Sequence, residues 1–343
     1  MPTACITQPD STVHLKSERL EITGWNEAHD RKVTLREIPM RDLDRLILNE
    51  TVQITSQAMA ALLRSDIPIS ILGWNGQCLG AFLPATNAHG LARLCQYRRI
   101  QDSQFLLQMA GRIVTAKIYN QRRVIQRLAL NRSENPAAIP IEDAAPTLAW
   151  LDSIMSILPK AANVDELRGY EGASTARYFQ AWAKFLPDEF PFERRSTRPP
   201  LNPVNACISF GATLLYAEAV AFIHAHGLDP ALGLLHATEN GRWSLALDLI
   251  EPFRPALVEA LALDLFSHQI LEPAHFEPKN GGVYLNDTGR KKFILQYERR
   301  MERQFLSEAV DCRTTLRQQL EAQAVMFKAA LEEPTRFEPF LIN

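Results

Sequence analysis

Residues 231–255, ALGLLHATENGRWSLALDLIEPFRP, carry one histidine and, further on, two acidic residues within an apolar run. Carboxylates that alternate with core leucines are costly to bury unless a cation or hydrogen-bond donor pairs with them. Asp248 and Glu251 are three residues apart and would share one face of a helix. His236 precedes them, where a loop can bring it over that face. One imidazole and one or two carboxylates in a cleft predict a site for a divalent metal.

The composition is that of a soluble globular protein, with 343 residues, 46% hydrophobic and 22% charged. With a net charge of −2, any surface for nucleic acid must be a local patch. Five scattered cysteines without CxxC pairs favour reduced thiols over disulfides or zinc. No signal-peptide pattern is visible, and the most apolar run, 206–216, is expected to stop at Glu218, too short to span a bilayer. We therefore expect a cytoplasmic protein.

The first part of the chain is predicted to be β-rich. A helix is expected at 56–64, capped by Thr55 or Ser56, and a hairpin follows it at 67–83. Residues 84–92 are typical of a linker. Short alternating segments predict four strands, at 13–15, 20–22, 32–38 and 45–48. The predicted fold class is α+β, with a β-rich domain at 1–88 and a larger all-α domain at 93–330.

The second part of the chain is predicted to be built from long amphipathic helices, followed by a tail at 331–343 that is either disordered or partner-binding. A helix is expected to begin at 168, with Glu171 near its start between two glycines that would allow close backbone approach. On its own, Glu171 is better explained as an acid favoured by the positive end of the helix dipole.

Basic residues are concentrated in two places. Residues 93–132 contain nine Lys and Arg against one acid, Asp102. Such asymmetry indicates phosphate contact, although a solvated helix face would give the same pattern. The loop at 191–203 is also basic and rich in proline. The candidates for DNA-phosphate contact are Arg195, Arg242, Arg254, Lys292, Arg112, Arg122 and Arg123.

Seven segments in order, spanning about residues 10 to 305, resemble one family. It is the CRISPR-associated integrase of spacer acquisition, the Cas-one family, which acts in antiviral defence. The segments are IPMRDLDRLILNETVQITSQAMAALLRSDIPISIL (38–72), NQRR (120–123), YEGASTARYF (170–179), RPPLNPVNACISFGATLLYAE (198–218), LDPALGLLH (228–236), SLALDLIEPFRP (244–255) and GGVYLNDTGRKKF (281–293).

The resemblance implies a β-rich dimerisation domain and a helical catalytic domain with metal-dependent endonuclease and integrase chemistry. The family's metal ligands correspond to Glu171, His236 and Glu251, with Asp248 as an auxiliary acid. Carboxylate ligands favour Mg²⁺ or Mn²⁺ over zinc. The nucleophile would be the 3′-hydroxyl of incoming DNA in integration and water in a nuclease reaction. The implied partners are double-stranded DNA (prespacer and CRISPR leader-repeat), a second copy of the chain, and the small adaptation protein "Cas-two".

Three other functions are considered. A casposase, the related transposon integrase, would carry an additional DNA-binding domain after the catalytic one. A non-catalytic DNA-bending scaffold would have lost one of the three ligand residues, and all three are present. A repair nuclease for branched DNA is compatible with the same site.

Overall fold

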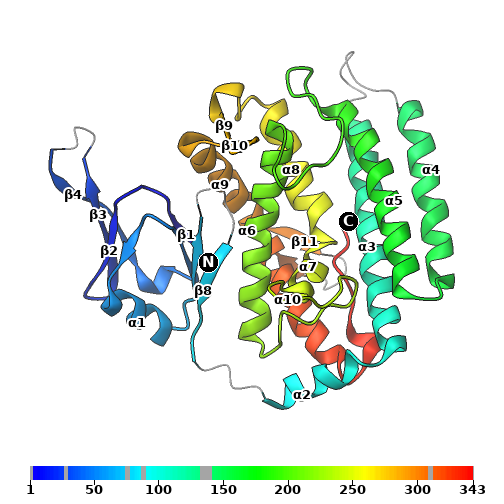
Figure 1. The fold of residues 1–343 in the computed structure, drawn as a ribbon, viewed down its shortest axis with the longest axis horizontal. Coiled ribbons are helices and arrows are strands. Elements are labelled where there is room, and N and C mark those ends of the chain that lie inside the picture. Colours follow the sequence, from blue (N-terminus) through cyan, green and yellow to red (C-terminus); the bar gives the residue numbers. More distant parts are fainter. Residues whose placement is uncertain are drawn as a thin grey trace. The chain divides into compact units, whose positions relative to one another are not determined.

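The computed structural model describes residues 3–26, 30–73, 78–85, 90–131, 141–307 and 312–342. The chain forms two compact units, Met1–Ala88 and His89–Asn343. The first unit is β-rich and the second is mainly helical (Figure 1). The predicted fold class is therefore confirmed.

Two four-stranded sheets make up most of the first unit. In one sheet, the order is β1–β5–β7–β8, with β1, β5 and β7 parallel and β8 antiparallel to β7. In the other sheet, the order is β4–β3–β2–β6, antiparallel except for the β2–β6 pair. The strands are β1 Thr3–Ile6, β2 Thr12–Lys16, β3 Arg19–Trp25, β4 Lys32–Pro39, β5 Arg45–Asn49, β6 Gln53–Ile54, β7 Ile69–Leu72 and β8 Cys78–Phe82, with a short helix η1 at Met40–Asp42. The four predicted strands and the hairpin are present, whereas β1 and β6 were not predicted.

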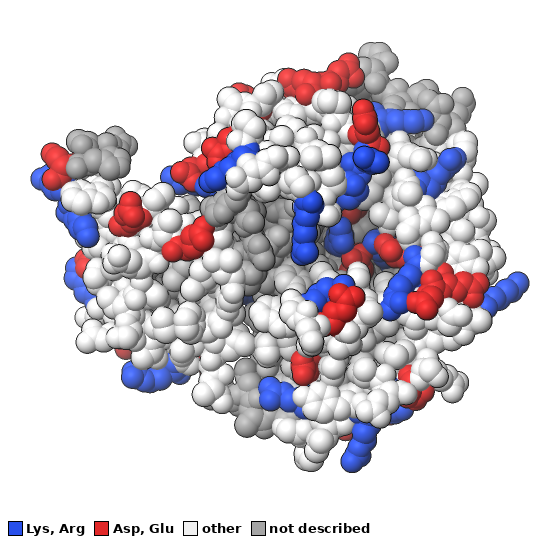
Figure 2. All heavy atoms as spheres, in the orientation of Figure 1, with Lys and Arg blue, Asp and Glu red and all other residues white. Residues whose placement is uncertain are grey.

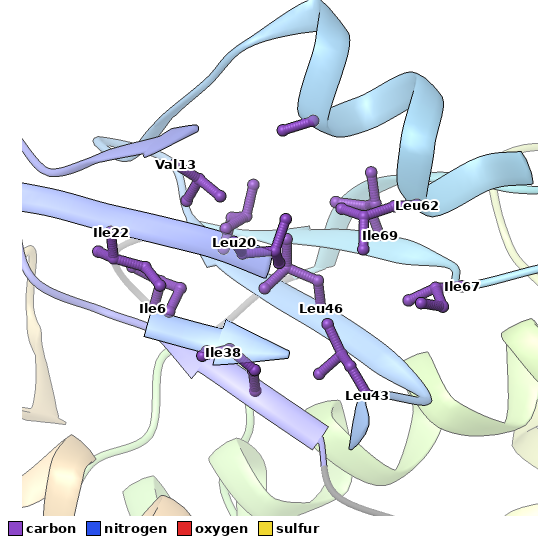
Figure 3. Packing of buried hydrophobic residues seen from close by; sticks show 13 residues of the cluster. Ile6, Val13, Leu20, Ile22, Ile38, Leu43, Leu46, Leu62, Ile67 and Ile69 are labelled. Carbon is purple, nitrogen blue, oxygen red and sulfur yellow. The ribbon is translucent and has the colours of Figure 1, made fainter. Parts of the chain in front are cut away.

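The first unit has its own hydrophobic core. Helix α1, Ser56–Arg64, begins where the Thr55 hydroxyl accepts the N–H of Ala58 at 3.3 Å. Its Leu62 is fully buried with the strand residues Val13 and Leu46 (Figure 3). Because side chains from the helix and from the strands meet in one cluster, this unit does not depend on the helical unit for its apolar burial.

The second unit packs its helices around α6, Pro203–Ala225. Long helices α3, α4 and α5 lie side by side in Figure 1 and pack together. The remaining elements follow in chain order: α2 Gly90–Arg99, α3 Ser103–Asn131, α4 Ile141–Ile157, η2 Leu158–Lys160, α5 Val164–Trp182, η3 Ala183–Phe185, α7 Ser244–Ile250, the π-helical η4 Arg254–Glu259, α8 Ala260–Ser267, η5 Pro273–His275, β9 Phe276–Lys279, β10 Gly282–Leu285, α9 Asp287–Glu302, β11 Phe305–Ser307, β12 Cys312–Thr314, α10 Leu316–Ala330 and η6 Pro334–Arg336.

Helix α6 continues past Glu218, the acid at which the most apolar run of the sequence stops. It has 23 residues and is long and apolar enough to cross a membrane by composition, but 72% of its most apolar window is buried inside the unit. The Glu218 carboxylate is accommodated because the Arg317 guanidinium from α10 pairs with it at 3.0 Å. We conclude that α6 is apolar because it is the core helix of this unit.

The carboxy-terminal residues, for which the sequence left a disordered and a partner-binding tail open, pack on the helical unit. The Phe340 ring stacks on Phe253 with 4.4 Å between centroids and 9° between planes. Phe337 is 1% exposed. Arg112 of α3 donates to three backbone carbonyls of the tail, including that of Phe337 at 2.7 Å. The aromatic residues in this segment therefore serve as anchors on the helical unit.

Candidate metal centre

The loop before α7 is folded around the buried carboxylate of Asp248. Its oxygens accept the backbone N–H groups of Leu234, Leu235 and His236 at 2.5, 3.1 and 2.9 Å. The same carboxylate pairs with Nδ1 of His236 at 2.6 Å. Because Nδ1 faces Asp248, Nε2 is the ring nitrogen that can bind a metal. This confirms that the loop carries His236 back to the face of α7, as its sequence predicted.

The pKa of His236 reflects the charges around it. Burial lowers it, but the hydrogen bond and charge of Asp248, helped by Glu251, outweigh burial and raise the pKa above its usual value. Lys117 acts in the opposite direction. The imidazole is therefore within the electrostatic range of both Glu251 and Lys117.

Gly233 makes the turn that places His236. A Cβ on Gly233 would lie 2.0 Å from the His236 carbonyl oxygen and 2.6 Å from Cβ of Ser244. We therefore expect Gly233→Ala to move the His236 backbone and to weaken Mn²⁺ binding at the candidate centre more than tenfold, at a stability cost of about 1–3 kcal/mol. Gly172→Ala is the matched control, because a Cβ there meets nothing within 4 Å. Equal Mn²⁺ affinity of the two variants, measured by calorimetric titration, would contradict the role of Gly233.

Lys117 of α3 stands between the two predicted acidic ligands. Its Nζ contacts Oε1 of Glu171, from α5, and Oε2 of Glu251, which follows α7. The side chains of Lys117 and Glu251 are 4% and 3% exposed, and that of Glu171 is 23% exposed. Arg254 pairs with the other oxygen of Glu251 at 2.9 Å. Two carboxylates far apart in sequence thus converge on one ammonium group.

Opposite charges keep this centre ionised in spite of its burial. Burial raises the pKa of Glu251, but Arg254, Lys117 and His236 outweigh it and lower the pKa to about 2. Burial likewise disfavours the ammonium of Lys117, but Glu251 and Glu171 outweigh it and raise its pKa. Burial raises the pKa of a third acid, Glu259, which is 1% exposed at the end of η4.

The Asn120–Gln121 pair supports both acidic ligands through hydrogen bonds. Gln121 donates to the Thr175 hydroxyl at 3.2 Å, and that hydroxyl donates to Glu171 at 2.9 Å. Asn120 donates to the carbonyl of Pro252, next to Glu251, at 2.7 Å and to that of Phe340 at 2.9 Å. Both side chains therefore have a structural, hydrogen-bonding role in this part of the unit.

Glu171 lies well inside a helix. Helix α5 begins at Val164, where the Asn163 side chain accepts the N–H of Glu166 at 2.9 Å. The prediction that Glu171 sits at the helix start was wrong, so the helix dipole does not account for this acid. A Cβ at Gly169 or Gly172 would meet nothing within 4 Å among the described residues, so the expected close backbone approach is not found there.

Two of the predicted phosphate-contacting residues lie beside the acidic centre. Arg254 pairs with Glu251, as described. Arg195 donates to Oδ1 of Asn205 at 2.8 Å and to the Ser209 hydroxyl at 2.9 Å. Burial, with a further contribution from the charge of Arg254, lowers the pKa of Arg195 to about 10. On the face shown in Figure 2, Lys and Arg side chains lie next to Asp and Glu in a recess of the helical unit.

The remaining basic candidates are engaged in other contacts. Arg112 donates to three backbone carbonyls of the tail, as described above. Lys117, one of the nine basic residues at 93–132, is buried in the centre. The other contacts are Arg122 with Asp152 at 2.6 Å, Arg123 with Gln126 at 2.9 Å, Arg242 with Glu239 at 3.0 Å, and Lys292 with the Ile270 carbonyl at 3.1 Å.

The donor set fits a hard divalent metal, although the centre is closed around Lys117. Within the described ranges, no three His, Cys, Asp or Glu side chains are gathered closely enough to form a ready-made metal cluster. However, Glu171 and Glu251 already point at one cation, and His236 is oriented by a carboxylate as metal-binding histidines are. Lys117 and Glu259 were missed as members of the centre, because only the fold brings α3 and η4 to it.

An oriented imidazole, two carboxylates around one cation and a buried arginine are groups that metal-assisted phosphodiester chemistry can use. Together, the fold and the site indicate a phosphodiester-cleaving or phosphodiester-transferring protein. The family model for CRISPR associated protein Cas1 matches residues 4–299. The chain therefore belongs to the Cas1 family of CRISPR-associated endonucleases and integrases of spacer acquisition, which confirms the family predicted from the seven segments.

Characterised relatives cover most of the chain. A CRISPR-associated endonuclease Cas1 of Thermus thermophilus is 31% identical over 98% of this chain and 98% of its own length. A CRISPR-associated exonuclease Cas4/endonuclease Cas1 fusion of Geobacter sulfurreducens is 32% identical over 86% of this chain. The chain spans 53% of the length of that fusion.

Solved structures share the fold. A Cas1 protein from Thermotoga maritima superposes with a TM-score of 0.78 at 24% identity, over 100% of this chain and 99% of that one. A casposase bound to integration product superposes with a TM-score of 0.84 at 22% identity, and the match covers 97% of this chain and 91% of that one. A chain of a Cas6-RT-Cas1–Cas2 complex superposes with a TM-score of 0.79 at 23% identity, and the match covers 99% of this chain and 36% of that one.

Proposed function

We propose that this Cas1-family protein is a divalent-metal-dependent DNA endonuclease and integrase that inserts spacer DNA into a CRISPR array. The 3′-hydroxyl of the incoming DNA would attack a phosphodiester at the repeat boundary, and water would replace it in the nuclease reaction. One observation carries the proposal: Glu171 and Glu251 converge on a single cation. His236, oriented by Asp248, lies within the electrostatic range of Glu251.

Each residue of the centre has a separate role in the proposed reaction. Glu171, Glu251 and His236 would hold Mg²⁺ or Mn²⁺, which when bound offsets the charge on phosphate oxygens and assists deprotonation of the nucleophile. Asp248 fixes the tautomer and direction of His236. Arg254 keeps Glu251 ionised and would offer its positive charge to a phosphate that binds at the metal centre.

DNA would be held mainly through its phosphates. Arg254 and Arg195 are the proposed contacts at the centre, with Arg242, Lys292, Arg122 and Arg123 as more distant candidates. Each phosphate contact that forms on binding releases counterions, so binding weakens steeply as salt rises and is largely independent of base sequence.

The proposed partners are double-stranded DNA, a second copy of the chain through the β-rich unit, and Cas2. The likeness to the Cas1 part of a Cas6-RT-Cas1–Cas2 complex is consistent with Cas2 as partner, and the homodimer rests on the family resemblance. A cytoplasmic location agrees with the reduced thiols of Cys95 and Cys207.

The casposase alternative shares this fold. The superposition with a casposase is close, but at 22% identity it concerns the fold alone. The match to the Cas1 family model over residues 4–299 favours spacer acquisition. The non-catalytic scaffold is disfavoured because Glu171, His236 and Glu251 all remain in the centre.

Strand integration tests the proposal directly. The purified protein and its Cas2 partner are mixed with a short duplex bearing free 3′-hydroxyls and a supercoiled plasmid that carries a leader and repeat. We expect half-site products with Mn²⁺ or Mg²⁺ and none with EDTA, with activity restored by added metal. Equal product in EDTA would refute metal dependence. DNA binding without any product would favour the scaffold function.

A further inference from the structure

Lys117 occupies the position between the two carboxylates where a shared cation belongs. Its ammonium group contacts one oxygen of Glu171 and one oxygen of Glu251. The Lys117 side chain is 4% exposed, so water does not compete effectively for these contacts. A divalent ion that binds both carboxylates needs the same space, and the two cations cannot share it.

The groups that pair directly with Lys117 or Glu251 are already balanced in charge without a metal. Two carboxylates, Glu171 and Glu251, face two cations, Lys117 and Arg254, whereas Asp248 pairs with His236. A divalent ion would add two positive charges next to these two cations in a poorly solvated place, where like charges repel strongly. A DNA phosphate would supply the missing negative charge and accept the displaced ammonium group, which the flexible lysine side chain can follow.

We propose that Lys117 is a resident cation that opposes metal loading until DNA phosphate arrives, so that metal binding and DNA binding are coupled. The inference rests on the proposed function and adds a regulation of its metal centre. In the free protein, the ammonium group holds the two carboxylates together. Because the metal then binds only together with the DNA, cleavage by a metal-loaded protein that has not bound its DNA substrate is reduced.

Mn²⁺ binding measures this coupling with a readout that does not depend on catalytic activity. Free Mn²⁺ is followed by electron paramagnetic resonance for wild type, Lys117→Met and Lys117→Arg, with and without a duplex that lacks free 3′-hydroxyls. We expect DNA to tighten Mn²⁺ binding about tenfold in wild type, within the usual range of coupling between sites. Lys117→Met should bind Mn²⁺ about tenfold more tightly without DNA and lose most of the coupling, and Lys117→Arg should keep it.

Unchanged or weaker Mn²⁺ binding by folded Lys117→Met would overturn the inference, because it would make Lys117 a support for the ligands. Wild type alone provides a second test, needed if that variant fails to fold: equal Mn²⁺ affinity with and without DNA also refutes the coupling. His236→Ala and Glu251→Gln separate this inference from the proposed function. If both variants bind Mn²⁺ as tightly as wild type, the metal binds elsewhere and the proposed function and this inference both fail. If both variants lose Mn²⁺ binding, the metal centre is supported, and the Lys117 variants then decide whether Lys117 opposes the metal.

Discussion

His236→Ala and Glu251→Gln are expected to lower metal-dependent strand integration by about a thousandfold, with the fold retained. A metal in such a site supplies several kcal/mol of transition-state stabilisation, and each 1.36 kcal/mol is about tenfold in rate. Glu251 is a proposed ligand held by two cations, and its amide would lose both the charge and the affinity for the metal. The measurement is the initial rate of half-site formation on a plasmid, with circular dichroism to verify folding.

Glu239→Gln is the control for this prediction. It makes the same chemical change on an acid that is 59% exposed and pairs only with Arg242 among the contacts described. Its rate should stay within about twofold of wild type, because exposed pairs contribute little. A Glu251→Gln rate as high as that of Glu239→Gln would mean that Glu251 is not a ligand.

Arg317→Met is expected to destabilise the helical unit by about 3–5 kcal/mol, because it leaves a buried carboxylate without its cation. The Arg317 side chain, 8% exposed, pairs with the 1% exposed carboxylate of Glu218 and with Glu298 at 3.0 Å. Tyr297 also donates to Glu218, at 3.1 Å. Arg317 thus joins helices α6, α9 and α10, and chemical denaturation followed by circular dichroism would measure the loss.

Arg336→Met serves as the matched control. Its pair with Glu333 is exposed on both sides, at 64% and 57%, and should contribute less than about 1 kcal/mol. If the two variants unfolded at the same denaturant concentration, the Arg317 cluster would not be the support that its burial implies. A thermal scan should show a drop of roughly 10 °C for Arg317→Met, given about 2–4 °C per kcal/mol for units of this size.

Local patterns were sufficient for much of the fold. Alternation predicted the strands at 13–15 and 45–48, and the hydroxyl of Thr55 correctly indicated the start of α1. The edge strand β1 was missed because its four residues are too few to show a period. The start of α5 was misplaced because its cap, Asn163, precedes a first turn with few apolar residues.

The sequence by itself determined the family and the identity of the three proposed ligands, since side-chain chemistry and order along the chain are sufficient for both. It also indicated that His236 folds back over Asp248, because the two lie in one local segment. Only the tertiary structure showed that Lys117 stands between Glu171 and Glu251, and that Arg112 holds the tail. These contacts join residues more than fifty positions apart, and no periodicity or spacing records which helices will pack together.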